Sequence, residues 1–313
     1  MTVNYAEPLS EGFNRMKKAL FQPFDLPKWI TVGFTAFLAG LTECSSGGGG
    51  GSNGKINNNI NDFNLDKIFS FPEIARDWLL EHPLWFGLII AALVLIFVIA
   101  TVLTWVSSRG KFMFLYNVAN NTDAVVKPWY DYRKQGNSLF WWQFFYGWLV
   151  FGVIILLAIY GFGVAKNIHT GVVPEVSKVG FIVSFVITIV ALLVIFGYIS
   201  LFLNDFIVPI MYKHNLTATQ AWSKFLTLTL QHPGSFILYG LFVFAVGIGV
   251  GILILLAALL TCCIGLLLIM IPFVGSVILL PVSYTFRAFS IGFLAQFGDY
   301  FSINEETAGV LPQ

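Results

Sequence analysis

Hydrophobic residues gather into long runs that contain no charge, and short polar segments separate these runs. The longest run, Pro233–Phe286, has 54 consecutive residues without Asp, Glu, Lys or Arg, and Leu84–Ser108 has 25. A helix needs about 20 residues, at 1.5 Å rise each, to cross ~30 Å of hydrocarbon. Because the longest run is about twice that length, it predicts a hairpin of two helices. We therefore predict six membrane-spanning helices, at residues 27–43, 84–108, 139–165, 179–204, 234–261 and 270–297.

Shorter stretches carry apolar residues at helical spacing with polar or basic residues on the opposite face. They are residues 9–21, 71–81 and 217–231. This pattern is typical of helices that lie in the membrane interface. Thr217 and Gln220 fit a capping box, and Ser70 and Glu73 have the same spacing. The predicted fold is thus an all-α integral membrane protein, a single membrane domain over residues 1–313, with three two-span units and amphipathic interfacial helices.

Composition excludes an ordinary soluble domain. The chain is 57% hydrophobic and 11% charged, with a mean hydropathy of +0.81, whereas soluble domains carry about 25% charged residues. There is too little charge to solvate a globular surface. We expect membrane lipids, together with other membrane proteins, as partners, and no nucleic acid.

The distribution of Lys and Arg predicts the orientation. If the N-terminus is cytoplasmic, the inside segments hold 12 of these residues and the outside segments hold 5. Cytoplasmic loops are enriched in Lys and Arg, so we expect both termini inside. About 28 residues of mixed charge precede the first span, and no cleavable signal peptide is expected. The Gly- and Asn-rich residues 45–64 then form an outer loop that we expect to be disordered.

Three cysteines are candidates for a disulfide rather than for a metal. Cys44 follows the first span, and Cys262 and Cys263 lie at the expected turn of the last hairpin. In the predicted topology all three face the outer side, where an oxidising compartment permits disulfides. Buried packing roles for these cysteines stay open, as does lipidation of Cys44, which the preceding Glu43 disfavours.

Two charges stand beside or inside apolar helices. Asp205 follows the fourth span, and Arg287 lies inside the last one. An Arg near the bilayer centre costs about 2.5–3.5 kcal/mol on insertion scales. We predict that Asp205 and Arg287 form a structural ion pair that joins these two spans. Separate snorkelling of each side chain to the headgroups is the alternative.

The remaining motifs favour packing over chemistry. Gly247 and Gly251 have the spacing that lets two membrane helices approach closely. A nucleotide-binding fingerprint would need a strand before these glycines and an acidic residue after them, and the sequence predicts neither. Pro272 and Pro281 interrupt the last run, and we interpret Pro272 as a helix start. We predict no catalytic residues, no cofactor and no metal site.

One resemblance follows from three stretches. They are RMKKALFQPFDLPKWITVGF, LNDFIVPIMY and TCCIGLLLIMIPFVGSVILLPVSYTFRAFSIGFLAQFG. The chain resembles a group of uncharacterised bacterial six-span membrane proteins, which are distantly similar to the membrane domain that accompanies some glycerophosphodiesterases. The resemblance implies a bacterial cytoplasmic (inner) membrane location and six spans. It implies no activity, because the chain is too short to hold the separate catalytic barrel.

Three function classes are open at this point. We expect a protein without catalytic machinery that organises lipids or partner proteins in the membrane. The alternative is a transporter or channel for a small or lipidic solute, suggested by six spans and the Pro and Gly breaks. An intramembrane enzyme is the third class, and the scarcity of polar residues at depth argues against it.

Overall fold

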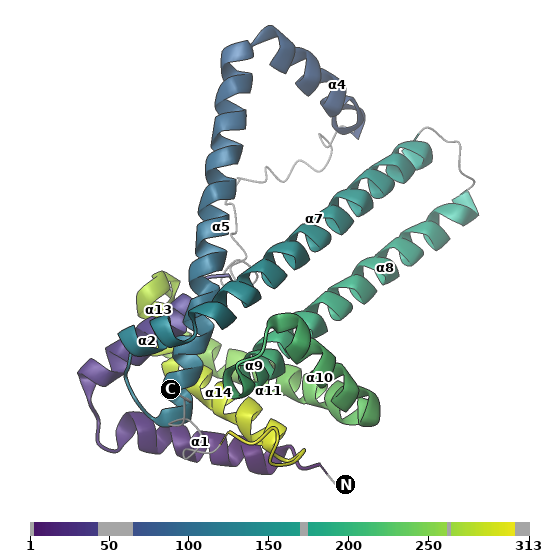
Figure 1. The fold of residues 1–313 in the computed structure, drawn as a ribbon. Coiled ribbons are helices and arrows are strands. Elements are labelled where there is room, and N and C mark those ends of the chain that lie inside the picture. Colours follow the sequence, from purple (N-terminus) through teal and green to yellow (C-terminus); the bar gives the residue numbers. More distant parts are fainter. Residues whose placement is uncertain (1–2, 43–64, 170–174, 262–263, 304–313) are drawn as a thin grey trace. The chain divides into compact units, whose positions relative to one another are not determined.

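The computed structural model describes residues 3–42, 65–169, 175–261 and 264–303, and every regular element within them is helical (Figure 1). The elements are α1 (Ala6–Phe21), α2 (Leu26–Gly40), α4 (Leu65–Glu81), α5 (Pro83–Asn120), α6 (Val126–Asp131), α7 (Arg133–His169), α8 (Glu175–Phe202), the π-helical turn η2 (Leu203–Ile207), α9 (Val208–His214), α10 (Ala218–Gln231), α11 (Pro233–Leu260), α12 (Ile264–Met270), α13 (Pro272–Ile278) and α14 (Leu280–Ala295).

The chain divides into two compact units. Unit 1 comprises Met1–Cys44, Thr104–Gln143 and Gly197–Gln313, and unit 2 comprises Ser45–Leu103 and Phe144–Phe196. The expectation that residues 1–313 form a single membrane domain stays a prediction.

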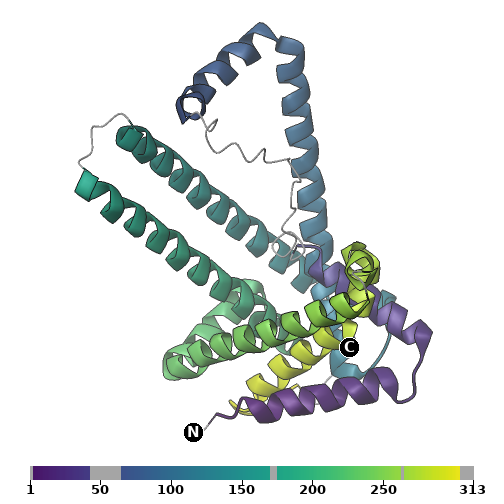
Figure 2. The same ribbon diagram turned by 180° about the vertical axis from the view of Figure 1, so that it is seen from behind.

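Unit 1 holds the buried core. Helix α1 lies alongside α14 in both views of the ribbon (Figures 1 and 2). The two helices can come this close because Gly12 has no side chain. A Cβ there would stand only 3.0–3.4 Å from backbone atoms of Thr285 and Phe289. The second half of α5 is also enclosed: all residues from Gly110 to Ala119 are buried. Large aromatic side chains fill the centre of this unit, and Phe206, Phe225, Phe236, Phe289 and Phe293 are fully buried.

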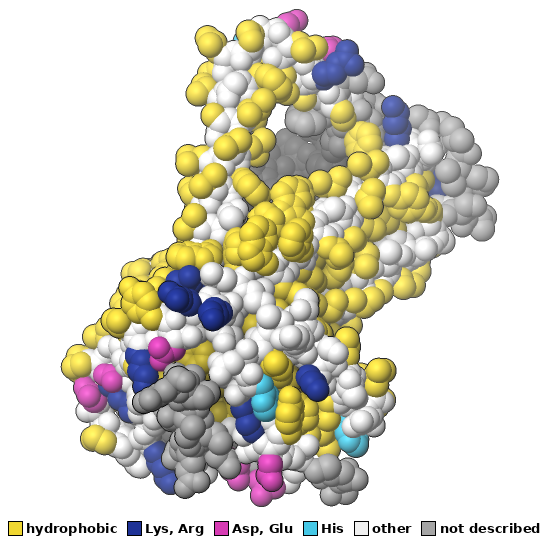
Figure 3. All heavy atoms as spheres, in the orientation of Figure 1, with side chains coloured by type: hydrophobic (Ala, Val, Ile, Leu, Met, Phe, Trp, Pro, Cys, Tyr) yellow, Lys and Arg dark blue, Asp and Glu magenta, His cyan; other side chains and the backbone are white. Residues whose placement is uncertain are grey.

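Unit 2 is made of apolar helical segments that pack through a few aromatic contacts. The hydroxyl of Tyr146 in α7 donates to the Phe196 carbonyl in α8 at 2.9 Å. The Phe185 ring packs where Gly161 has no side chain, and Tyr160 contacts the same ring at 6.4 Å between centroids. Hydrophobic side chains cover much of the visible faces of α5 and α7 (Figure 3).

The helix starts predicted at Pro272 and at Thr217 are confirmed, and two further helices also begin at a proline. Pro83, Pro233 and Pro272 are the first residues of α5, α11 and α13, where the missing proline N–H costs no hydrogen bond. Thr217 and Gln220 form the predicted capping box before α10: the Thr217 N–H donates to Gln220 Oε1 at 3.1 Å. The start predicted at Ser70 is wrong, because α4 begins at Leu65 and contains Pro72 in its interior.

Within the described residues, four helices are long and apolar enough to cross a membrane. They occupy Pro83–Asn120, Arg133–Ile168, Lys178–His214 and Pro233–Leu260. The first three contain the predicted spans 84–108, 139–165 and 179–204, and the fourth matches the predicted span 234–261 to within one residue at its end. A fifth span is present if α13 and α14 are counted as one, although the pair is bent by 63°. The predicted helices at 9–21 and 71–81 lie within α1 and α4, and the one at 217–231 corresponds to α10 with its N-cap. The position of these helices relative to a membrane stays a prediction. The predicted disordered loop 45–64 falls outside the described residues.

The remaining two predicted spans differ from continuous 20-residue helices. Helix α2 has 15 residues, which is about 22 Å at 1.5 Å per residue. The span at 270–297 breaks between α13 and α14, where Pro281 has no N–H to donate to the Val277 carbonyl four residues earlier. The indole Nε1 of Trp29 in α2 donates to this carbonyl at 2.9 Å. The break is therefore compensated by a side chain from the neighbouring short helix.

Candidate functional site

A π-helical turn lies where α8 meets α9, and the sequence explains it. In a π-helix each N–H donates five residues back, and the Val208 N–H donates in this way to the Leu203 carbonyl. The next donor in this pattern would be the N–H of residue 209, which is Pro209 and has none. The Asn204 carbonyl therefore needs a partner from elsewhere in the molecule.

Arg287 supplies that partner. Its Nη1 donates to the Asn204 carbonyl at 2.5 Å, and its guanidinium carbon lies 6.0 Å from the centroid of the Phe114 ring. Arg287 is 9% exposed, and its Nε has no hydrogen-bond partner among the described residues. A charge buried to this degree is stabilised by hydrogen bonds and by the aromatic ring rather than by water.

A second cation and a carboxylate belong to the same cluster. Lys111 of α5 is 2% exposed, and its Nζ donates to Asn204 Oδ1 at 2.6 Å. The hydroxyl of Tyr239, in α11, donates to the Asp205 carboxylate at 2.9 Å. We call Lys111, Asn204, Asp205, Tyr239 and Arg287 the π-turn cluster. It joins α5, η2, α11 and α14 by hydrogen bonds inside unit 1.

Asp205 and Arg287, the predicted ion pair, both belong to the π-turn cluster. Arg287 bonds to the main chain of Asn204, and Asp205 is the next residue along the turn. A direct Asp205–Arg287 ion pair stays a prediction. Lys111, Asn204 and Tyr239 were not predicted as site residues. The only local signal was Pro209, which stands five residues after Asn204.

The predicted packing glycines have open surroundings within the described chain. A Cβ at Gly247 or Gly251 would meet no described atom within 4 Å, so their role in helix packing stays a prediction. Close approach occurs at another glycine, Gly110, where a Cβ would stand 2.6 Å from the Leu38 carbonyl carbon and 2.7 Å from the Ala39 nitrogen. The candidate disulfide residues Cys44, Cys262 and Cys263 lie outside the described residues.

A cluster of tyrosines holds the turn between α6 and α7. The Tyr132 and Tyr212 rings stack with 4.8 Å between centroids, and Asn120 Nδ2 donates to the Tyr212 hydroxyl at 3.0 Å. Burial, followed by the proximity of Tyr212, raises the pKa of Tyr132 well above its usual range. The Tyr132 hydroxyl therefore stays protonated at physiological pH and serves as a structural hydrogen-bond group.

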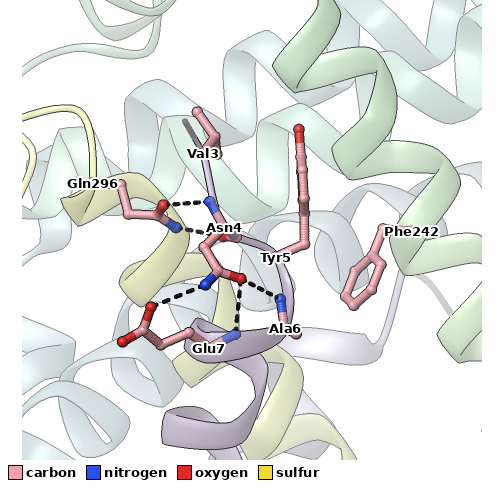
Figure 4. Close-up of a pocket in the computed structure, with 7 residues that line it drawn as sticks. All are labelled: Val3, Asn4, Tyr5, Ala6, Glu7, Phe242 and Gln296. Carbon is pink, nitrogen blue, oxygen red and sulfur yellow. Dashed lines mark hydrogen bonds between the residues drawn. The ribbon is translucent and has the colours of Figure 1, made fainter. Parts of the chain in front are cut away.

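An open pocket of about 650 Å³ lies at the N-terminal end of α1 (Figure 4). Its polar groups bond to one another: the Asn4 N–H donates to Gln296 Oε1 at 2.9 Å, and Gln296 Nε2 donates back to the Asn4 carbonyl at 2.8 Å. Asn4 Oδ1 also accepts from the N–H groups of Ala6 and Glu7. These contacts cap α1 and fasten it to the segment that follows α14. The polar groups of the pocket therefore have a structural role.

Metal chemistry has no donor set within the part of the chain that the structure describes. No three His, Cys, Asp or Glu side chains there lie close enough to share one ion. The His82 ring stacks on that of Trp78, with 4.8 Å between ring centroids.

Comparison with known proteins gives one match. A family model described as a family of unknown function (DUF7544) matches residues 4–298. No curated protein and no solved structure matches the chain. The similarity to glycerophosphodiesterase-associated membrane domains stays a prediction. Because the match extends over nearly the whole length, the chain belongs to the family of unknown function DUF7544.

Proposed function

We propose that this protein crosses the membrane several times and organises lipids or partner proteins there, without catalytic machinery. The observation that carries the proposal is the aromatic core of unit 1. Ring centroids of Phe206 and Phe225, and of Phe206 and Phe236, are 5.2 Å apart, and those of Tyr239 and Phe293 are 4.5 Å apart. A core filled in this way supports a rigid scaffold better than a solute pathway.

The apolar helices support a role that depends on what surrounds them. The most apolar 18-residue windows of α5, α7 and α8 have no buried residue. Exposed apolar surface of this extent marks a contact with hydrocarbon or with another protein. Lipid chains and partner helices are the two surroundings that satisfy it.

The proposed topology has six spans with both termini in the cytoplasm. Helix α2 is the short first span, and α13 with α14 is the broken last one. The excess of Lys and Arg in the segments assigned to the inside supports this orientation. The location that we propose, from the resemblance stated above, is a bacterial cytoplasmic membrane.

Reconstitution tests the proposal against transport. The protein is purified in a mild detergent, its retained lipids and companion proteins are identified by native mass spectrometry, and proteoliposomes are assayed for flux of ions and small solutes. We expect retained lipid or companion protein at a fixed ratio and no flux above that of empty liposomes. Protein-dependent flux of a solute would contradict the proposal.

A transporter is the second candidate, and the π-turn cluster favours it. Lys111 and Asp205 place ionisable groups on helices that are long enough to cross the membrane, and Arg287 places one on the second half of the bent α13 and α14 pair. Such groups often mark ion or proton pathways. In that case the Asp205→Asn variant would abolish the flux that the native protein shows, because the carboxylate could no longer exchange charge.

A further inference from the structure

Arg109 is held between two tryptophan rings at the end of the longest apolar stretch of α5. Its guanidinium carbon lies 4.4 Å from the centroid of the Trp105 ring and 5.0 Å from that of Trp129. The two rings are nearly perpendicular and 5.8 Å apart. Cation–π contacts of this kind fix the plane of a guanidinium without using its hydrogen-bond donors.

The start of α7 completes the enclosure. Gly136 leaves room for Arg109, since a Cβ there would stand 2.9 Å from Arg109 Cγ. Asn137 Oδ1 accepts from Arg109 Nη2 at 3.1 Å. A guanidinium has five N–H donors, and Asn137 takes one, while the buried Nε has no partner among the described residues. The terminal nitrogens thus keep donors for a ligand with several acceptor oxygens.

The surrounding charge favours an anion. Arg133 lies close enough for its charge to act on Arg109. Over residues 126–143 the charged side chains are Lys127, Arg133 and Lys134 against Asp131, and all four are exposed. The two basic residues at the start of α7 therefore add positive charge beside Arg109 without a matching number of carboxylates.

The position along the chain indicates headgroup depth. Arg109 directly follows the 25 uncharged residues of Leu84–Ser108, so it stands where the apolar run of α5 ends. Tyr130 and Trp141 are 63% and 56% exposed. Aromatic side chains with one polar end, next to Lys and Arg, are typical of the boundary between hydrocarbon and water. An anion bound at this depth is a lipid headgroup.

We propose that Arg109, between Trp105 and Trp129, binds the phosphate of an anionic phospholipid together with Arg133 and Lys134. This inference rests on the proposed function, since it requires helix α5 to cross a membrane and the protein to act on lipids. Arg109 presents the fixed guanidinium to the phosphate oxygens, and the two exposed cations attract the net negative headgroup.

Native mass spectrometry with added lipid tests the site. The purified full chain is titrated with phosphatidylglycerol or with phosphatidylcholine, and affinities are compared for the native protein, Arg133→Gln/Lys134→Gln, Arg109→Gln and Arg109→Lys. We expect a preference of the native protein for phosphatidylglycerol, and a loss of about tenfold or more in that affinity when both exposed cations are removed. Arg109→Lys keeps the charge but loses the planar fork, so its affinity should be intermediate.

The matched control is Lys17→Gln/Lys18→Gln, which removes two exposed cations from α1. It should leave the preference unchanged. Equal losses in the two double variants, or equal binding of both lipids by the native protein, would overturn the proposal. Because Arg109→Gln also removes ring contacts, its thermal unfolding is measured beside that of the exposed double variant, which should fold normally.

The outcomes separate this inference from the proposed function. If the native protein retains phosphatidylglycerol but none of the variants lowers its affinity, the site is wrong while a lipid role stands. If the native protein retains neither lipid nor companion protein, the proposed function fails as well. A companion protein that is lost in the Arg133→Gln/Lys134→Gln variant, with lipid binding unchanged, would assign the surface to a protein partner and overturn the lipid site.

Discussion

At the scale of single residues, Pro209 explains why the buried Arg287 side chain bonds to the backbone of the π-helical turn. Pro209 removes the donor that the Asn204 carbonyl would have in the π-helical pattern, and Arg287 donates to that carbonyl. A buried, unpaired carbonyl costs free energy comparable to a lost hydrogen bond. Arg287 is therefore explained as a structural donor, even though an arginine inside an apolar helix first suggests an ion pathway.

Substitution of Arg287 should reveal this dependence on Pro209. We expect Arg287→Met to lower the free energy of unfolding by about 1–3 kcal/mol, because it leaves the buried Asn204 carbonyl without a hydrogen-bond donor. Adding Pro209→Ala restores an N–H that can donate to Asn204, so the double variant should recover part of the loss. Thermal unfolding in detergent measures both values, with the exposed Arg133→Met as control. An identical cost of Arg287→Met with and without Pro209→Ala would contradict the explanation.

At the scale of elements, glycines set which helices come together. Gly110 lets α5 approach the backbone of α2 at Leu38 and Ala39, whereas Gly247 in α11 faces no described atom within 4 Å. The sequence motif of two glycines four residues apart predicted close packing at Gly247 and Gly251. It could not show which face of α11 has a neighbour, because that depends on the arrangement of other helices.

A pair of glycine substitutions checks this assignment. Gly110→Ala should lower the free energy of unfolding, because a Cβ would overlap backbone atoms that have no free room to move. Gly247→Ala should be neutral or stabilising by up to about 1 kcal/mol, since alanine is the better helix former. Thermal unfolding of the two variants in the same detergent compares them directly. A marked loss for Gly247→Ala would reveal a packing partner at that face of α11.

The long helices and the proline interruption of the last run could be predicted from the sequence, but the side chains that satisfy the freed carbonyls could not. Uncharged runs of about 20 residues or more predicted α5, α7, α8 and α11, and Pro272 predicted where α13 begins. The π-turn and the bend between α13 and α14 depend on side chains from distant segments, Arg287 and Trp29, which take over carbonyls that prolines leave without a donor. Asp205 and Arg287 were recognisable as unusual charges, but their partners Tyr239 and Asn204 belong to the tertiary structure.

At the scale of the whole molecule, α5, α7 and α8 cross a membrane in the proposed topology. Their most apolar windows have no buried residue, and only hydrocarbon or partner helices satisfy such surfaces. The exposed cations beside Arg109 then lie on the same side as the loop that connects α9 with α10. This arrangement predicts which positions a reagent outside the cell can reach.

Labelling of single cysteines with a membrane-impermeant maleimide tests this claim most directly. In intact cells that express a variant with Cys44, Cys262 and Cys263 replaced by Ser, one cysteine is introduced at Glu81, Asp123, Asn167 or Thr219, all of which are exposed. We predict labelling at Glu81→Cys and Asn167→Cys without lysis, and labelling at Asp123→Cys and Thr219→Cys only after the cells are opened. Equal labelling of all four positions in intact cells, or protection of Glu81→Cys with exposure of Asp123→Cys, would contradict the account.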